Sequence, residues 1–294
     1  MLSSARTGTP HYRPFMMGDV EAAVRLSAAV GWAHRQEDWR FAAAAGNGYV
    51  ACSEDAIIGT AFCWTFGDDR ATLGMLIVAP ERQGCGIGRR LLEHVANVAG
   101  NRMTFLYATA AGKPLYESVG FRACGTLTQY RGIPAHIPEK HALEQETLRE
   151  LADEDMPAVI QMASRACGLD RRDILLSLRA LARGVVIERE GEIVGFSLIR
   201  PFGLGYAIGP VIAAPSHDDA RAKRLIGHWL AQHAGDVVRI DAPETANLGP
   251  WLRHLGLTPA SHVVRMVRNI AENVQLGELD NNWRYYAVIN QALG

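Results

Sequence analysis

The sequence predicts an α/β protein in which two similar domains follow one another. Strand-like and helix-like segments alternate along its 294 residues, a pattern typical of a sheet flanked by helices. A glycine-rich turn joins a hydrophobic strand to an amphipathic helix in the first half, and the second half repeats residues of the first at a nearly constant spacing. The length also suits two domains of ordinary size better than one.

The elements of the first half can be placed in order along the chain. A helix is expected after Asp19, whose side chain is of a type favoured at helix starts. The amphipathic helix that follows the glycine-rich turn ends near Gly100, and a short helix runs from Pro114 to Gly120. Turn-forming residues separate the predicted strands, which are 48–52, 56–64, 71–78, 103–109 and 126–130.

The second half matches the first at equivalent elements. Arg13 and Asp19 recur as Arg149 and Asp155, a spacing of 136 residues (149 − 13). The other matched pairs are Ile57 with Ile193, Gly59 with Gly195, Gly74 with Gly209, Pro114 with Pro250 and Gly120 with Gly256. The spacing is 136 residues in each pair except Gly74 with Gly209, where it is 135 (209 − 74). This nearly constant spacing indicates a tandem duplication, with two unrelated α/β domains as the alternative.

These matches divide the chain into four parts. Residues 10–132 form the first domain and 147–270 the second, and 133–146 are a linker with two prolines and little periodicity. Residues 271–294 lie beyond the repeat. Because Trp283 and Tyr286 make this segment too apolar for a free tail, we expect it to pack on one of the domains.

The glycine-rich turn predicts an anion site. Gly84, Gly86 and Gly88 alternate at the start of a helix, where unpaired backbone N–H groups and the helix dipole favour negative charge. Glycines allow the backbone to approach an anion closely. The spacing does not fit the dinucleotide fingerprint, and the strand 103–109 lacks the acid that this fingerprint requires. The G-K-[ST] of nucleotide hydrolases is also missing.

The stretch from Gln83 to Gly88 does fit the pattern Q/R-x-x-G-x-G/A, and here the chain resembles the GCN5-related N-acetyltransferase (GNAT) family. "KPLYESVGF", from Lys113 to Phe121, is similar to a second signature of that family. The resemblance extends from about Tyr12 to Tyr130. It implies a mixed, strongly twisted sheet flanked by helices, in which the central strands 71–78 and 103–109 splay apart.

The resemblance also implies acetyl-CoA as co-substrate. Backbone groups of Leu76, Ile77 and Val78 would hold the pantetheine. The pyrophosphate would lie on the turn and the helix start, formed by Gln83, Gly84, Cys85, Gly86, Ile87, Gly88 and Arg89. Arg89 and Arg90 lie in the first turn of the helix, where the dipole disfavours cations. A phosphorylated ligand would offset this, with Arg82 and Lys113 nearby; solvated surface charges are the alternative.

Tyr116 falls where the family usually carries its general acid, although a tyrosine that packs in the core is the alternative. The general base is open, since the strand 71–78 contains no carboxylate or histidine. The region that normally forms the acceptor pocket runs from Gly31 to Phe41. It offers His34, Glu37 and Asp38 as titratable groups and Trp32 and Trp39 as walls. Solvated helix residues and a chain of waters are the alternatives for the base.

The second half lacks both diagnostic features. Its counterpart of the glycine-rich turn reads "SHDDARAKRLI", with Asp218 and Asp219 at the helix start. Carboxylates there are expected to satisfy the backbone amides and to repel a pyrophosphate. The counterpart of Tyr116 is Leu252. We therefore predict that the second half does not bind CoA and instead walls the acceptor pocket or offers a rigid face.

Together these features predict an acetyl-CoA-dependent N-acetyltransferase that acts on a small-molecule primary amine, by direct transfer, in the first half. A protein N-acetyltransferase and a non-catalytic acyl-CoA sensor are the alternatives. A net charge of -1 argues against nucleic-acid and membrane partners. Five cysteines without C-x-x-C spacing and the absence of a signal peptide or apolar span indicate a cytoplasmic protein without a structural zinc site. His228 and His233 are not spaced as metal ligands, and a homodimer is compatible with the sequence.

Overall fold

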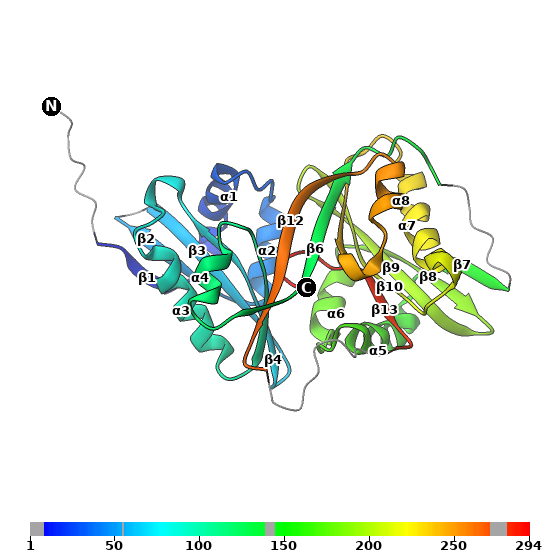
Figure 1. Ribbon diagram of the computed structural model, residues 1–294, viewed down its shortest axis with the longest axis horizontal. Coiled ribbons are helices and arrows are strands. Elements are labelled where there is room, and N and C mark those ends of the chain that lie inside the picture. Colours follow the sequence, from blue (N-terminus) through cyan, green and yellow to red (C-terminus); the bar gives the residue numbers. More distant parts are fainter. Residues whose placement is uncertain (1–8, 55, 139–144, 271–280) are drawn as a thin grey trace.

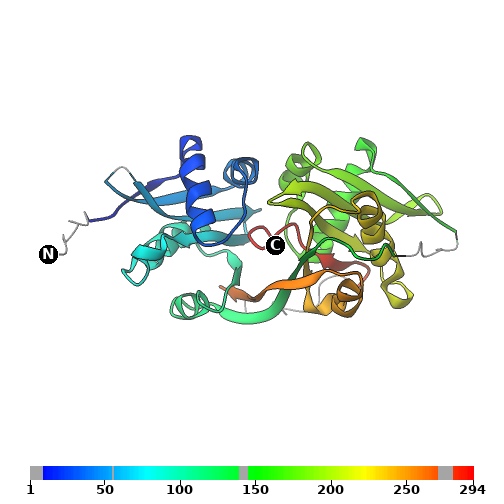
Figure 2. The same cartoon turned by 90° about the horizontal axis from the view of Figure 1, so that it is seen from above.

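The computed structural model describes residues 9–54, 56–138, 145–270 and 281–294. Within these ranges one mixed sheet of 13 strands crosses the molecule, with helices packed on its two faces (Figures 1 and 2). The strand order is β1-β2-β3-β4-β5-β12-β6-β11-β10-β9-β8-β7, and β13 pairs with β10. The first half of the chain lies on the left of Figure 1 and the second on the right.

The first repeat contains the elements that the sequence predicts, together with additional ones. Its strands are β1 (His11–Pro14), β2 (Asn47–Ser53), β3 (Ala56–Phe66), β4 (Arg70–Val78), β5 (Met103–Ala108) and β6 (Arg122–Gly132). Its helices are α1 (Val20–Ala29), α2 (Gln36–Ala45), α3 (Ile87–Ala99) and α4 (Lys113–Glu117), with 3-10 turns η1 (Met17–Asp19) and η2 (Pro80–Arg82). Helix α3 buries Leu91, Leu92 and Val95 against the sheet, as its apolar stripe predicts.

The second repeat follows the same order. Its strands are β7 (Glu146–Glu150), β8 (Arg183–Arg189), β9 (Glu192–Phe202), β10 (Gly205–Ala213), β11 (Val238–Pro243) and β12 (Thr258–Arg268), and β13 (Arg284–Ala287) lies beyond it. Its helices are α5 (Met156–Cys167), α6 (Arg172–Arg179), α7 (Ala220–Gln232) and α8 (Gly249–His254), with 3-10 turns η3 (Asp153–Asp155), η4 (His217–Asp219) and η5 (Glu244–Ala246).

One ion pair recurs at the same place in both repeats. The Arg13 guanidinium donates to both carboxylate oxygens of Asp19 at 2.7 and 2.8 Å, and Arg149 does the same to Asp155 at 2.7 and 2.9 Å. Each carboxylate also accepts a backbone N–H three residues earlier. The guanidinium bonds lower the pKa of both carboxyl groups. The duplication read from the sequence is thus visible in the side-chain contacts as well as in the element order.

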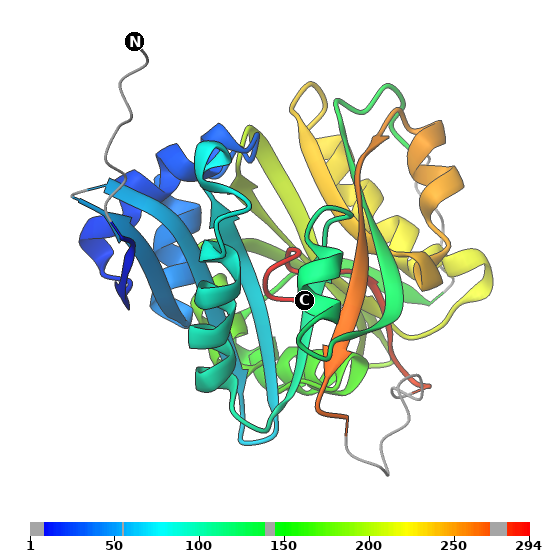
Figure 3. The same ribbon diagram turned by 60° about the vertical axis from the view of Figure 1, so that its left-hand side comes forward.

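The two repeats exchange their last strands. Strand β6 leaves the first repeat to pair with β11, whereas β12 of the second repeat pairs with β5, and β6 and β12 pair with one another. Figures 1 and 3 show this antiparallel pair, green and orange, at the centre of the molecule. Each spatial half of the molecule therefore contains a strand from the other repeat.

Each repeat contains a pair of parallel strands that part after three residue pairs. Strands β4 and β5 are in register from Arg70 with Met103 to Thr72 with Phe105 and then diverge, as the resemblance implies. Strands β10 and β11 likewise stay in register only from Tyr206 to Ile208.

The split in the second repeat is filled by the chain itself. Strand β13 pairs with β10 at Val211–Ala213, and the backbone N–H of Val288 donates to the carbonyl of Asp241 on β11 at 2.9 Å. Tyr286, Ala287 and Val288 are consequently buried. Beyond β13 the chain turns toward the first repeat, where Figure 2 shows it as a red loop between the halves. Residues 271–280 lie outside the described ranges.

Candidate active site

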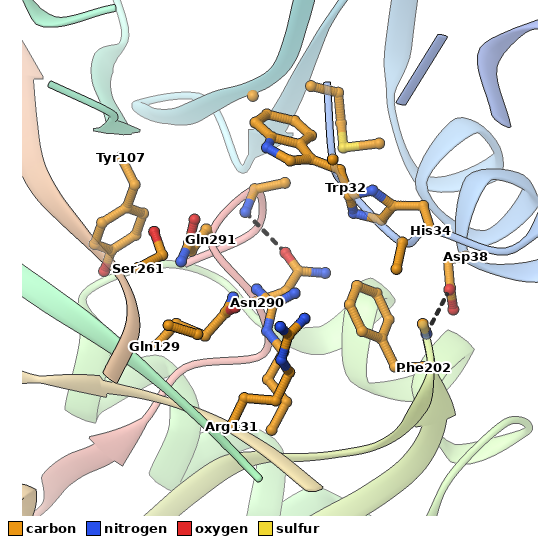
Figure 4. A pocket seen from close by; sticks show the side chains of 18 of the residues that line it. Trp32, His34, Asp38, Tyr107, Gln129, Arg131, Phe202, Ser261, Asn290 and Gln291 are labelled. Carbon is orange, nitrogen blue, oxygen red and sulfur yellow. Dashed lines mark hydrogen bonds between the residues drawn. The ribbon is translucent and has the colours of Figure 1, made fainter. Parts of the chain in front are cut away.

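A cavity of about 450 Å³ lies where the two halves meet. The first repeat contributes the loop between α1 and α2, the middle of β4, the end of β5 and the start of α4. The exchanged strands β6 and β12 contribute one wall. The turn between β9 and β10, strand β11 and residues 290–292 complete it. Figure 4 shows side chains from these separate elements pointing toward one another around the cavity.

Strand β4 is kinked where it meets the cavity. Met75 has a φ of +51°, and the register with β3 shifts at this point. The buried Thr60 hydroxyl donates to the Met75 carbonyl at 2.8 Å and so stabilises the kink. Met75 and Leu76 line the cavity, whereas Ile77 is buried in the core. The backbone expected to hold pantetheine therefore borders the cavity at Leu76.

The glycine-rich turn is open to solvent and adopts a conformation that favours glycine. Gly84 and Gly86 have φ values of +76° and +79°, and no atom of the described residues lies within 4 Å of the place that a Cβ would take at either position. Gly86 precedes α3 without a side-chain cap, and the first turn of α3 contains no acid. Ile87 anchors the turn in the core, and Cys85 is exposed. The helix start can thus receive an anion.

The cations near this turn already have polar contacts. Arg89 donates to the Ser118 hydroxyl at 2.9 Å, which ties the start of α3 to the end of α4. Arg90 pairs with Glu93 at 3.1 Å, and Lys113 lies 3.5 Å from Glu117. At the other end of the turn, the Gln83 amide donates to the Val78 carbonyl at 3.2 Å. These contacts fix the turn relative to β4 and α4.

Tyr116 faces the cavity from α4. Its ring is almost entirely buried and packs edge-on against Phe121. Burial raises the pKa of the Tyr116 hydroxyl above its ordinary value. The phenol therefore keeps its proton across the neutral pH range and can act as a donor.

The residues predicted for the acceptor pocket separate into two groups. Trp32, His34 and Asp38 line the cavity. Glu37 is exposed and lies 3.8 Å from Arg40, while Trp39 is fully buried and donates to the Ser27 hydroxyl. The last two residues do not contribute to the walls. Successive residues of a helix point about 100° apart, so neighbours in sequence reach different surroundings.

Asp38 holds the two halves together. Its carboxylate accepts the backbone N–H of Gly203, in the turn between β9 and β10, at 3.0 Å. Arg35 donates to the same carboxylate at 3.0 Å, and Arg200 lies 3.8 Å away. This carboxylate is buried and engaged by three groups from the two repeats, so it acts as a contact between the halves.

His34 is a titratable group that lines the cavity in its neutral form. Its Nδ1 atom is buried and has no partner in the part of the chain that the structure describes. Burial, and secondarily the positive charge of Arg239 with a further contribution from Arg200, lowers the pKa of His34 to about 4. The imidazole is therefore uncharged at neutral pH.

This shift predicts a pH dependence of stability. The pKa of a histidine is near 6.5 when unfolded and about 4 in the fold, so only the unfolded chain binds a proton between these values. The free energy of unfolding should fall as the pH drops through this range. At about 1.4 kcal/mol per pKa unit the limit is about 3 kcal/mol, and we expect about 2 kcal/mol because His34 is partly exposed.

Urea unfolding of wild type and a His34→Gln variant at pH 7 and pH 4.5 measures this effect. The variant should lose less stability on acidification than wild type. His11→Gln, at an exposed site on β1, is the matched control and should behave as wild type. Parallel losses in wild type and His34→Gln would contradict the assignment.

Several lining residues were not foreseen individually from the sequence. They come from the exchanged strands, from β11 and from the C-terminal segment, and they include Gln129, Arg131, Arg239, Ser261, Asn290 and Gln291. The sequence suggested only that the second half walls the pocket. Arg131 and Arg239 are charged residues inside strand segments, near the end of β6 and the start of β11, and this is the one signal that could have singled them out.

The start of α7 in the second repeat corresponds to the start of α3, but the contacts of its carboxylates differ from those expected from the sequence. Asp219 precedes α7 in the left-handed conformation, as Gly86 precedes α3. Its carboxylate does not cap the helix but accepts from Arg284 at 2.9 Å and from the Tyr286 hydroxyl at 2.8 Å. Asp218 pairs with Lys223. The prediction that these carboxylates satisfy the helix amides is wrong, because the C-terminal segment and Lys223 bind them.

The C-terminal segment also approaches the matched glycines of both repeats. A Cβ at Gly209 would collide with the carbonyl of Val288, and a Cβ at Gly74 would lie 3.0 Å from the Cα of Ala292. Leu252, the counterpart of Tyr116, is fully buried. One segment thus fills the split of the second repeat and continues into the cavity beside the first.

The described ranges contain no group of three or more His, Cys, Asp or Glu side chains that could hold a metal ion. None of their helices combines the length and apolar character needed to cross a membrane.

Comparison with known families agrees with this architecture. One family model described as an acetyltransferase (GNAT) domain matches residues 44–123, and another of the same description matches residues 159–276. The chain therefore belongs to the GNAT family and carries two such domains in tandem. It is an acyl-CoA-dependent acyltransferase, and GNAT domains use acetyl-CoA as a co-substrate.

Individual relatives are similar over much of the chain. An uncharacterized N-acetyltransferase, YitH, from Bacillus subtilis is 29% identical over 94% of this chain and 95% of its own length. A holothin acyltransferase from a Pseudoalteromonas species is 26% identical over 75% of this chain and 74% of its own. The crystal structure of a putative acetyltransferase from Pyrococcus horikoshii has a TM-score of 0.76 at 19% identity, covering 100% of this chain and 99% of the other, which shows a shared fold.

Proposed function

We propose that this enzyme transfers the acetyl group of acetyl-CoA directly to the primary amine of a small molecule, at one catalytic centre in the first half. The observation that carries the proposal is that Leu76 and Tyr116 border the same cavity as residues of the second half. A thioester delivered along β4 would end beside Tyr116. The rest of the cavity then has room for an acceptor.

The reaction needs a deprotonated amine, an oriented thioester carbonyl and a proton for the leaving thiolate. The neutral amine attacks the thioester carbonyl, the C–S bond breaks, the attacking nitrogen releases one proton to water, and the thiolate takes one proton from a donor that regains it from water. Tyr116 supplies that proton, since its buried phenol stays protonated at neutral pH. Backbone groups at the β4 kink orient the carbonyl. Asp38 is engaged by Arg35 and Gly203, and a histidine whose pKa is lowered to about 4 is a weak base, so the ammonium form loses its proton to water.

The second half does not bind CoA in this proposal. Its strand split is filled by β13, and its helix start is occupied by Asp219 with Arg284 and Tyr286. The second half contributes walls instead. A protein substrate is disfavoured because Glu37, the acid expected to attract a lysine tail, lies outside the cavity, whereas Arg131 and Arg239 line it.

Turnover tests the proposal. CoA release from acetyl-CoA is followed with a panel of small primary amines, a lysine-containing peptide and no acceptor. We expect at least one small amine to be acetylated with kcat/KM at least 10-fold above the peptide. Binding of acetyl-CoA without acetylation of any amine would support a sensor instead, and preference for the peptide would support a protein acetyltransferase.

A further inference from the structure

Three arginines form a row across four neighbouring strands of the second spatial half. Arg131 on β6 lies directly opposite Arg239 on β11. Arg239 is level with Ala207 on β10, and Ala207 lies opposite Arg200 on β9. Residues level with one another in adjacent strands share a face of the sheet. Arg131 and Arg239 line the cavity, and Figure 4 shows Arg131 pointing into it from β6.

The carboxylates around this row are too few to neutralise it. Asp241 pairs with Arg239, with bonds of 2.9 and 2.5 Å. Asp38 serves both Arg35 and, at 3.8 Å, Arg200. Arg131 has no ion pair within the described ranges. The wall therefore carries more positive than negative charge.

Two features of the row are unfavourable without a bound anion. Like charges directly opposite one another in a sheet destabilise it, which applies to Arg131 and Arg239. Arg200 is 4% exposed, and its Nε and Nη2 atoms have no partner among the described residues. Burial of a cation with unpaired donors is costly. A negative charge in the cavity would lower the free energy of all three groups.

Phe202 gives the wall its shape. The guanidinium groups of Arg200 and Arg239 lie 4.5 and 4.9 Å from the centre of its ring, on which they are held by cation–π contacts. Its other neighbour is His34, whose ring meets it edge-on at 5.4 Å. Trp32 lies close by, with its ring centre 5.8 Å from that of His34. An aromatic region thus adjoins the arginines inside one cavity.

We propose that the acceptor is an amine that also carries a carboxylate. The carboxylate binds the forked guanidinium of Arg131, which has no ion pair among the described residues. Arg239 donates its Nε and Nη2 atoms to Asp241 and adds positive charge beside this site. The apolar body of the acceptor contacts Trp32 and Phe202, and its amine reaches the end of the cavity between Leu76 and Tyr116. This assignment rests on the proposed function of the same cavity and specifies its substrate class.

Two matched pairs of amines test the assignment: phenylalanine with phenethylamine, and 6-aminohexanoate with pentylamine. Each pair differs by one carboxylate. Binding to the enzyme–CoA complex is measured by calorimetry, and kcat/KM with acetyl-CoA by CoA release. In at least one pair we expect the carboxylate member to bind at least 10-fold more tightly and to be acetylated in preference.

Arg131→Gln should abolish this preference by weakening the carboxylate member 10- to 100-fold while leaving its partner within about twofold. Arg131→Lys should retain part of it. Arg122→Gln, an exposed arginine on the same strand, is the matched control and should behave as wild type.

The two readouts separate this inference from the proposed function. Carboxylate-dependent binding without turnover of any amine would contradict the proposed function but would still support a carboxylate site at Arg131. Equal binding of both members of both pairs, or an equal loss for both members in Arg131→Gln, would overturn the inference.

Discussion

Replacing Tyr116 with phenylalanine should lower kcat by about 100-fold and leave the affinity for acetyl-CoA within about twofold. General acid catalysis contributes roughly 100- to 10,000-fold, and a thiolate that can also take a proton from water places the effect at the lower end. The ring of Tyr116 is almost fully buried, and phenylalanine preserves its packing on Phe121. The fold should therefore be retained.

Steady-state kinetics and calorimetry with acetyl-CoA measure the two quantities separately. Tyr49→Phe is the control, because it removes a hydroxyl from a ring that stacks on His94 outside the cavity. It should not change kcat. A loss in Tyr116→Phe that falls equally on CoA affinity and on rate would indicate that the tyrosine supports the structure and does not act as the acid.

Replacing Gly86 with aspartate should weaken CoA binding by about 100-fold. This variant copies the residue that precedes α7 in the second repeat, where Asp219 takes the same left-handed conformation. A carboxylate at this helix start would repel the pyrophosphate, and at short range such repulsion amounts to a few kcal/mol. No atom of the described residues lies within 4 Å of the place that a Cβ would take at Gly86, so the Cβ of the new side chain meets no obstacle.

Gly86→Asn separates charge from backbone strain. Asparagine has nearly the size of aspartate and tolerates the left-handed conformation comparably, without the charge. We expect it to weaken CoA binding by less than about 10-fold. If both variants bound CoA equally poorly, the loss would come from the backbone and the electrostatic account of the turn would fail.

Much of the fold was readable from the sequence because its signals are local. The glycine-rich turn, the apolar stripe of α3 and the strands around them depend on nearby residues, and each lies within a few residues of its predicted place. The repeat was visible in the sequence for the same reason, since Arg13 and Asp19 form a contact although they lie only six residues apart. Tyr116 and Leu76 were assigned by resemblance, and both border the cavity.

The exchange of β6 and β12 between the repeats has no comparable local signal in the sequence. Each strand has the pattern of a half-buried strand, and that pattern is equally satisfied beside either repeat. Arg131 and Arg239 could not be brought together in advance because their contact depends on this exchange. Residues 290–292 reach the cavity only because β13 fills the split between β10 and β11. Glu37 and Trp39 were grouped with Trp32 by closeness in sequence, which a helix does not preserve.

The central claim is that one repeat binds CoA and the other is closed by the C-terminal segment. Isothermal titration of the wild-type chain with acetyl-CoA tests it most directly. We predict one equivalent bound per chain, lost in Gly86→Asp at the same ligand concentration. Two equivalents, or one equivalent that survives in Gly86→Asp with unchanged affinity, would contradict this account.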